Sequence, residues 1–142
     1  MDQQSLYARL GGSDAIVAVI DDFVARCAGD GRINGKFART DIPRLKAMLV
    51  EQVTAASGGP AYYSGRSMEE THDGMGVTAG EFDALVGDLV ATLNRFNVPD
   101  AEQQELLGIL GPLRSDIVEI ESSQTGTPLP ASYEPAPPLP AA

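Results

Sequence analysis

The sequence has few residues that bind metals or act as nucleophiles. Its 142 residues include one cysteine, Cys27, one histidine, His72, and no tryptophan. A single cysteine excludes an internal disulfide and a thiolate metal cluster, and a single histidine excludes a multi-histidine zinc site. No apolar run approaches the roughly 18 residues of a membrane span, and no basic segment followed by an apolar stretch stands near Met1. We therefore expect a soluble, cytoplasmic protein without a membrane partner.

Positive charge is also scarce. Ten Lys and Arg residues stand against 20 Asp and Glu, for a formal net charge of -10. Nucleic-acid binding needs clustered positive charge, so we expect no nucleic-acid partner, and the acidity favours a monomer. One short segment gathers half of the bases, namely Arg32, Lys36, Arg39, Arg44 and Lys46. This basic cluster is either a solvated surface or a receptor for a small anion, and composition leaves both open.

Apolar residues recur at spacings of three and four, and no alternating strand pattern occurs. The pattern predicts an all-α fold with helices over about 13–28, 41–57, 78–94 and 99–118. Ser13 and Thr78 are the expected N-caps of two of them, and Pro112 is expected to interrupt the last. Residues 121–142 hold six of the ten prolines. We expect one domain over 1–120, followed by a flexible proline-rich tail over 121–142.

His72 is the residue with the most possible functional roles. It lies in the segment MEETHDGMG at 68–76, close to a glycine turn. Such a histidine is either a surface or capping residue, or a single axial ligand to a haem iron, for which one imidazole is enough. Catalysis without a cofactor is disfavoured, because no nucleophile motif surrounds Cys27 or any serine.

Nine short segments resemble, in order and spacing, the group I truncated haemoglobins, which are short globins with a two-over-two helical sandwich around haem. The resemblance runs from about Leu6 to Val118. The matching segments are LYARLGG at 6–12, Asp22-Phe23, Phe37, Arg44-Leu45-Lys46, Gly58-Gly59-Pro60, YSGRSM at 63–68 followed by His72, Phe82, Val98-Pro99 and LGPL at 110–113.

The resemblance implies that the cofactor is haem b and that His72 is the proximal iron ligand. The residues that it implies for the haem walls are Phe37, Leu45, Leu49, Val53, Met68, Met75, Phe82, Leu85, Leu89, Leu106 and Leu110. Lys46 and Tyr63, with Arg44, are the implied contacts of the haem propionates. The apolar set would serve equally well as ordinary core, and the cations as a solvated surface.

The distal side departs from the family pattern. Relatives often carry a tyrosine and a glutamine that donate hydrogen bonds to the bound gas, but here Val24 and Leu49 stand at those positions, with Leu45 beside them. Without donors of about 1–3 kcal/mol each, oxygen should dissociate faster, discrimination against carbon monoxide should be poor, and the haem should oxidise readily.

Three other distal residues bear on this pocket. Gln52 is expected at the haem edge or in solvent unless its amide swings toward the ligand. Met48 is either a flexible filler or a sixth iron ligand. Val53 replaces a frequent phenylalanine and should widen the route for gases.

We therefore expect a haem protein that reversibly binds a diatomic gas (O2, CO or NO) for storage, transport or sensing. One alternative is a haem enzyme, either a nitric oxide dioxygenase served by a reductase or a peroxidase-like protein. The missing distal donors argue against the first, and the lack of a distal acid–base group argues against the second. The other alternative is a haem-free helical interaction module.

Overall fold

The computed structural model describes residues 5–37, 41–60, 72, 74–127 and 130. Its helices, in chain order, are α1 (Leu6–Arg9), α2 (Gly12–Gly29), η1 (Asn34–Phe37), α3 (Ile42–Ala56), α5 (Ala79–Arg95), α6 (Asp100–Leu110), η2 (Gly111–Leu113) and α7 (Arg114–Ile117). The described residues form no strand, only an isolated parallel bridge between Thr78 and Ile120. The predicted all-α class is confirmed. Within the described part of the chain, no helix is long and apolar enough to cross a membrane.

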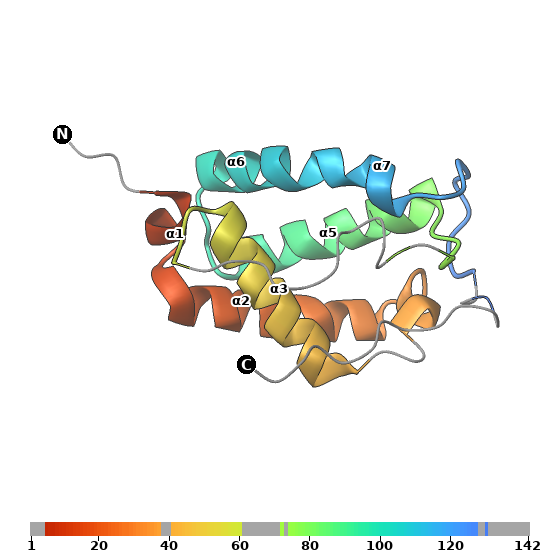
Figure 1. Ribbon diagram of the computed structural model, residues 1–142, viewed down its shortest axis with the longest axis horizontal. Coiled ribbons are helices and arrows are strands. Elements are labelled where there is room, and N and C mark those ends of the chain that lie inside the picture. The colour runs from red at the N-terminus through yellow and green to blue at the C-terminus, as the bar shows by residue number, and fades with distance from the viewer. Residues whose placement is uncertain (1–4, 38–40, 61–71, 73, 128–129, 131–142) are drawn as a thin grey trace.

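Helix α2 carries much of the hydrophobic core. It packs against both α3, which crosses it, and α5, whereas α3 and α5 make few direct contacts with each other (Figure 1). Its predicted apolar stripe belongs to the core, because all five of its members are buried: Ile16, Ile20, Phe23, Val24 and Cys27. Helix α1 packs on α6, and Gln103 of α6 donates to Asn94 and to the Val98 carbonyl at the end of α5.

The ends of the helices follow local sequence signals with one exception. Thr78 and Glu81 form a complete capping box at the start of α5, and Asp41 caps α3 by accepting from the Arg44 N–H. The 3-10 turn η2 interrupts the last helix around Pro112, as predicted. The prediction of Ser13 as an N-cap is wrong: α2 begins at Gly12, and Gly11 occupies the cap with a φ of 108° that favours glycine.

The chain does not leave the helical body at residue 121. Residues 118–127, which we call the C-terminal strap, run back along the start of α5. The Ala79 and Gly80 N–H groups donate to the Ile120 and Ser122 carbonyls, and the Gly126 N–H donates to the Arg32 carbonyl. Contacts with the body therefore continue to Thr127. The division into a 1–120 domain and a tail remains a prediction, but a tail that is free from residue 121 on is not what these residues show.

Candidate functional site

His72 lies in a half-buried helical position just before the turn that leads into α5. Its carbonyl accepts from the Met75 N–H at 3.1 Å. On either side of Met75, Gly74 and Gly76 have φ angles of 81° and 68°, which are unfavourable for a residue with a side chain. Tyr63 and Met68, predicted for the approach to His72, lie outside the described residues.

A buried ion pair joins this region to the element that carries Phe37. The Lys36 Nζ of η1 lies 3.8 Å from the Glu81 Oε1 of α5, with both side chains at most 5% exposed. Glu81 also accepts from the Thr78 N–H and from the N–H and hydroxyl of Thr127. A buried carboxylate is tolerated when it is paired and hydrogen-bonded in this way. The pair therefore fixes η1 against the start of α5, where Phe82 stands.

The residues predicted to wall the haem fall into two groups. Met75, Phe82, Leu89 and Leu106 are buried. The others in the described part of the chain are half-buried and contact the hydrophobic core, namely Phe37, Leu45, Leu49, Val53, Leu85 and Leu110. The second group includes Leu45, Leu49 and Val53 of α3 and Leu85 of α5, and these two helices both pack on α2 and make few direct contacts with each other. Half-buried apolar faces of this kind, with one imidazole nearby, fit a flat apolar cofactor with a single axial ligand.

Apolar residues occupy the predicted distal positions, and they pack against other apolar residues. Val24 is 3% exposed and belongs to the core, and Leu45 and Leu49 pack against that core from α3. Met48 and Gln52 are half-buried on the same helix. Nothing in this set can donate to a gas ligand except the Gln52 amide.

Val53 borders a small apolar cavity. The cavity has a volume of about 20 Å³, and its lining is entirely apolar: Leu10, Ala15, Ile16, Val19, Val53, Leu93, Val98 and Leu106. This is enough space for about one molecule the size of water, but a lining without polar partners disfavours water itself. Val53 thus borders an apolar space, and its role in widening the route for gases stays a prediction.

The predicted basic cluster does not converge on one anion site. Arg32 pairs with Asp30 at 2.8 Å, Lys36 is buried beside Glu81, and Lys46 pairs with Asp21 of α2 at 3.1 Å. Arg39 lies outside the described residues. Because Arg32, Lys36 and Lys46 each pair with carboxylates of their own, these three cations do not share one anion in this structure. Propionate contacts by Lys46, Arg44 and Tyr63 stay predictions.

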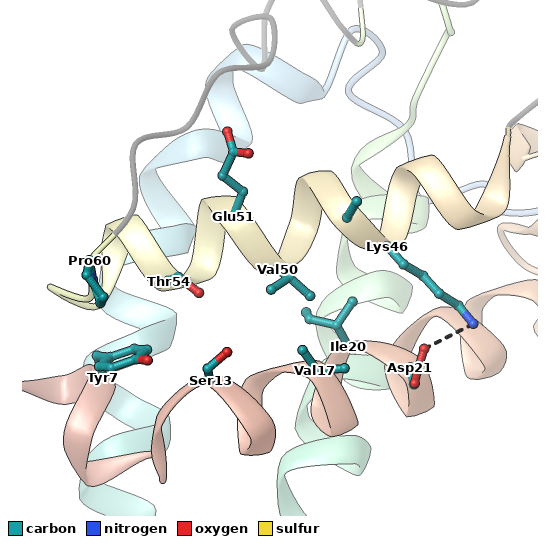
Figure 2. Close-up of a pocket in the computed structure, with 11 residues that line it drawn as sticks. Tyr7, Ser13, Val17, Ile20, Asp21, Lys46, Val50, Glu51, Thr54 and Pro60 are labelled. Carbon is teal, nitrogen blue, oxygen red and sulfur yellow. Dashed lines mark ion pairs between the residues drawn. The ribbon is translucent and has the colours of Figure 1, made fainter. Parts of the chain in front are cut away.

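Lys46 lies instead at a groove between α2 and α3, shown in Figure 2, where its side chain reaches toward Asp21. The groove has a volume of about 540 Å³, and its apolar lining includes Val17, which is 43% exposed, and Val50. The residues of α3 that line it follow Lys46 at spacings of one, four, five and eight. Leu45 and Leu49 are not among them, so the groove and the predicted distal pocket use different faces of α3.

A pair of carboxyl groups, Asp30 after α2 and Asp88 of α5, was not predictable from the sequence. Burial, and then the neighbouring Asp30, raise the pKa of Asp88 to about 6, and the Asp88 Oδ2 has no hydrogen-bond partner among the described residues. The hydrogen bonds from Arg32 hold the pKa of Asp30 well below its usual range. Burial raises the pKa of the nearby Cys27 thiol to about 12, so this thiol is not a nucleophile. The two aspartates are 58 positions apart, and no sequence pattern links them.

Glu119 was also missed, although it contacts the turn after His72. Its carboxylate accepts from the Gly76 N–H at 2.7 Å and from the Gly74 N–H at 3.0 Å. A glutamate beyond the last predicted helix carries no motif, and only the return path of the strap brings it to this turn.

The family model of the bacterial-like globins matches residues 5–119 of this chain. A group 1 truncated haemoglobin of Mycolicibacterium paratuberculosis is 36% identical over 120 residues, which are 84% of this chain and 88% of the relative. A group 1 truncated haemoglobin of Tetrahymena pyriformis is 32% identical over 81% of this chain and 95% of its own length.

Solved structures give the same result. The Fe(III) form of the Tetrahymena pyriformis truncated haemoglobin superposes with a TM-score of 0.78 at 32% identity, covering 81% of this chain and 98% of that one. The 2/2 haemoglobin of Synechococcus sp. PCC 7002, solved in the cyanomet state with covalently attached haem, gives 0.77 at 33% identity over the same shares. The helical fold and these matches together place the chain in the haem-binding globins, as a member of the group 1 truncated haemoglobins.

Proposed function

We propose that this protein holds haem b through His72 and reversibly binds a diatomic gas on the opposite, α3 side of the haem. The observation that carries the proposal is a pair of apolar faces, with His72 just before the turn that leads into α5. The face on α3 is half-buried at Leu45, Leu49 and Val53, and the face on α5 is buried at Phe82 and Leu89 and half-buried at Leu85. Haem iron supplies one coordination position for the imidazole and one for the gas. Imidazole binds through the ring nitrogen far from the backbone, and the apolar walls exclude water from the site.

The distal residues define the selectivity of this pocket. Apolar contacts are all that Leu45, Leu49 and Val24 offer, because none of them has a hydrogen-bond donor. Bound oxygen carries more charge on its outer atom than carbon monoxide does, and without a donor this charge receives little stabilisation. Met48 acts as apolar filler on α3, and the Gln52 amide is the single donor available in this set. Val53 and the small cavity beside it leave space for gases to approach. These features support gas binding with weak stabilisation of oxygen rather than peroxidase chemistry, which benefits from a distal acid–base group.

The test uses the fact that His72 is the only histidine in the chain. The full chain is titrated with haem, and absorption spectra of the ferric, ferrous and carbonyl forms are recorded. His72→Gly should abolish the ferrous five-coordinate spectrum and weaken haem binding by at least tenfold. Added imidazole should restore the spectrum, because it can occupy the space that the deleted side chain leaves.

Met48→Leu is the matched control on the other side of the haem. It should leave the ferric and ferrous spectra unchanged, since a filler methionine and a leucine have similar volumes. A changed ferric spectrum would instead identify Met48 as a sixth ligand. If His72→Gly kept an unaltered ferrous spectrum, the ligand assignment would fail, and a chain that bound no haem would favour an interaction module.

A further inference from the structure

The C-terminal strap contacts the segment that follows His72 at nearly every residue between 74 and 81. The Glu119 and Ile120 N–H groups donate to the Val77 carbonyl, at 2.9 and 3.2 Å. Further along, the Thr78 hydroxyl donates to the Gln124 carbonyl, and Thr127 donates twice to Glu81. The strap thus forms one side of the turn that connects His72 to α5.

The fit between the strap and α5 is close. A Cβ placed on Gly80 would lie 2.7 Å from the Ser123 carbonyl carbon and 2.8 Å from the Gln124 carbonyl oxygen. Real side chains do not tolerate such distances to backbone atoms, so only glycine allows the strap to approach here. At its far end the Gly126 N–H donates to the Arg32 carbonyl at 2.6 Å. These contacts hold the strap in place independently of Glu119.

Glu119 uses this position to bind the turn directly. Three successive amides are fixed: the Gly74 and Gly76 N–H groups donate to the Glu119 carboxylate, and the Met75 N–H donates to the His72 carbonyl. The positive φ angles at Gly74 and Gly76 belong to a backbone concavity that suits an anion. Hydrogen bonds from amides to a carboxylate are stronger than those between neutral groups.

We propose that Glu119 is a positioning residue for the His72 imidazole, with the C-terminal strap as its support. The inference rests on the proposed role of His72 as the iron ligand. The backbone that carries His72 is joined to the turn through its carbonyl, so the three fixed amides limit how far that backbone can rotate. The ring then keeps one orientation toward the haem instead of sampling several, as outer residues do for other metal-bound histidines.

The first experiment measures amide hydrogen exchange in the full chain without haem. Glu119→Gln keeps the shape of the side chain but replaces one carboxylate oxygen with an NH2 group. Because this group is a donor, one of the two glycine N–H groups loses its acceptor. We expect exchange at Gly74, Met75 and Gly76 to accelerate by about tenfold or more. Glu121→Gln is the matched control, because Glu121 lies two residues further along the strap and its carboxylate pairs with Arg114. It should leave these three rates unchanged.

The second experiment measures the iron–imidazole stretching band in the ferrous protein with haem bound. Glu119→Gln should shift or broaden this band, Glu121→Gln should not, and Glu119→Asp should bring it part of the way back. A purely structural role would lower stability without moving the band. Gly80→Ala, which pushes the strap away while Glu119 is intact, should reproduce the effect, and it serves as the test if Glu119→Gln folds poorly.

The outcomes separate this inference from the proposed function. Unchanged exchange in Glu119→Gln, or equal acceleration in both glutamine variants, would show that Glu119 does not fix the turn at Gly74 to Gly76. Faster exchange with an unmoved band would overturn the positioning of the imidazole while leaving His72 as the ligand. Absence of any iron–imidazole band in the wild-type protein would overturn the proposed function, and with it the positioning role. The exchange data would still report whether Glu119 fixes the turn.

Discussion

The two sides of the predicted haem site are built from different interactions. On the proximal side, η1, residues 74–81 and the C-terminal strap are joined by a buried ion pair, a capping box and a bound carboxylate. On the distal side, α3 contacts the core through leucine and valine side chains. Hydrogen bonds and ion pairs are directional, whereas apolar packing is not. The proximal side is thus suited to hold a ligand in one orientation, and the distal side to admit small apolar molecules without orienting them.

The largest expected effect comes from removing the polar centre of the proximal side. Glu81→Leu deprives the Lys36 ammonium, the Thr78 amide and the Thr127 donors of a buried acceptor. We expect a loss of about 3 kcal/mol in the free energy of unfolding, measured by urea denaturation of the haem-free chain. Glu121→Leu, at an exposed position of the strap, is the control and should leave stability unchanged. A loss below about 1 kcal/mol for Glu81→Leu would mean that the pair does not hold the two elements together.

A smaller effect follows from giving the distal side a donor. Leu49→Gln places an amide on the apolar face of α3, so oxygen should dissociate about tenfold more slowly, which corresponds to about 1.4 kcal/mol. Carbon monoxide dissociation should change much less. Stopped-flow replacement of each gas measures both rates. If the oxygen rate did not change, the absence of donors would not be what limits oxygen binding here.

The smallest effect concerns the pH dependence of stability near the aspartate pair. The pKa of Asp88 lies at about 6 in the folded chain against 3.8 ordinarily, because of burial and of Asp30. The folded state therefore binds the proton more tightly, and the stability contributed by protonated Asp88 is lost as pH rises from about 4 through 6.

Asp88→Asn removes this loss. Relative to the wild type, it should gain about 1 kcal/mol between pH 4 and pH 7, as measured by urea denaturation at both values. The opposite shift of Asp30 acts at lower pH, outside this window. Parallel stability curves for the two proteins would show that Asp88 does not titrate there.

The sequence predicted the helices well because their signals are local. Apolar spacing identified the buried stripe of α2, and Thr78 with Glu81 identified the start of α5. Ser13 was wrongly taken as a cap, since the glycine pair before it makes a turn that spacing alone does not reveal. His72 was selected because it is the only histidine, and its ligand role stays a prediction.

Contacts between distant segments were not predictable. Glu119 reaches Gly74 and Gly76 over more than 40 positions, and Asp88 meets Asp30 across two helices. The same limit explains the basic cluster: closeness in sequence suggested a shared anion, but Lys36 and Lys46 face carboxylates of α5 and α2. Directional contacts of this kind depend on the path of the whole chain.

The central claim is that His72 binds the haem iron, and one isotope measurement tests it most directly. Because the chain has a single histidine, growth with 15N-histidine labels only this imidazole. In resonance Raman spectra of the ferrous haem-loaded protein, we expect an iron–imidazole stretching band that moves to lower frequency on labelling. A missing band, or a band that does not move with the label, would contradict the assignment of His72.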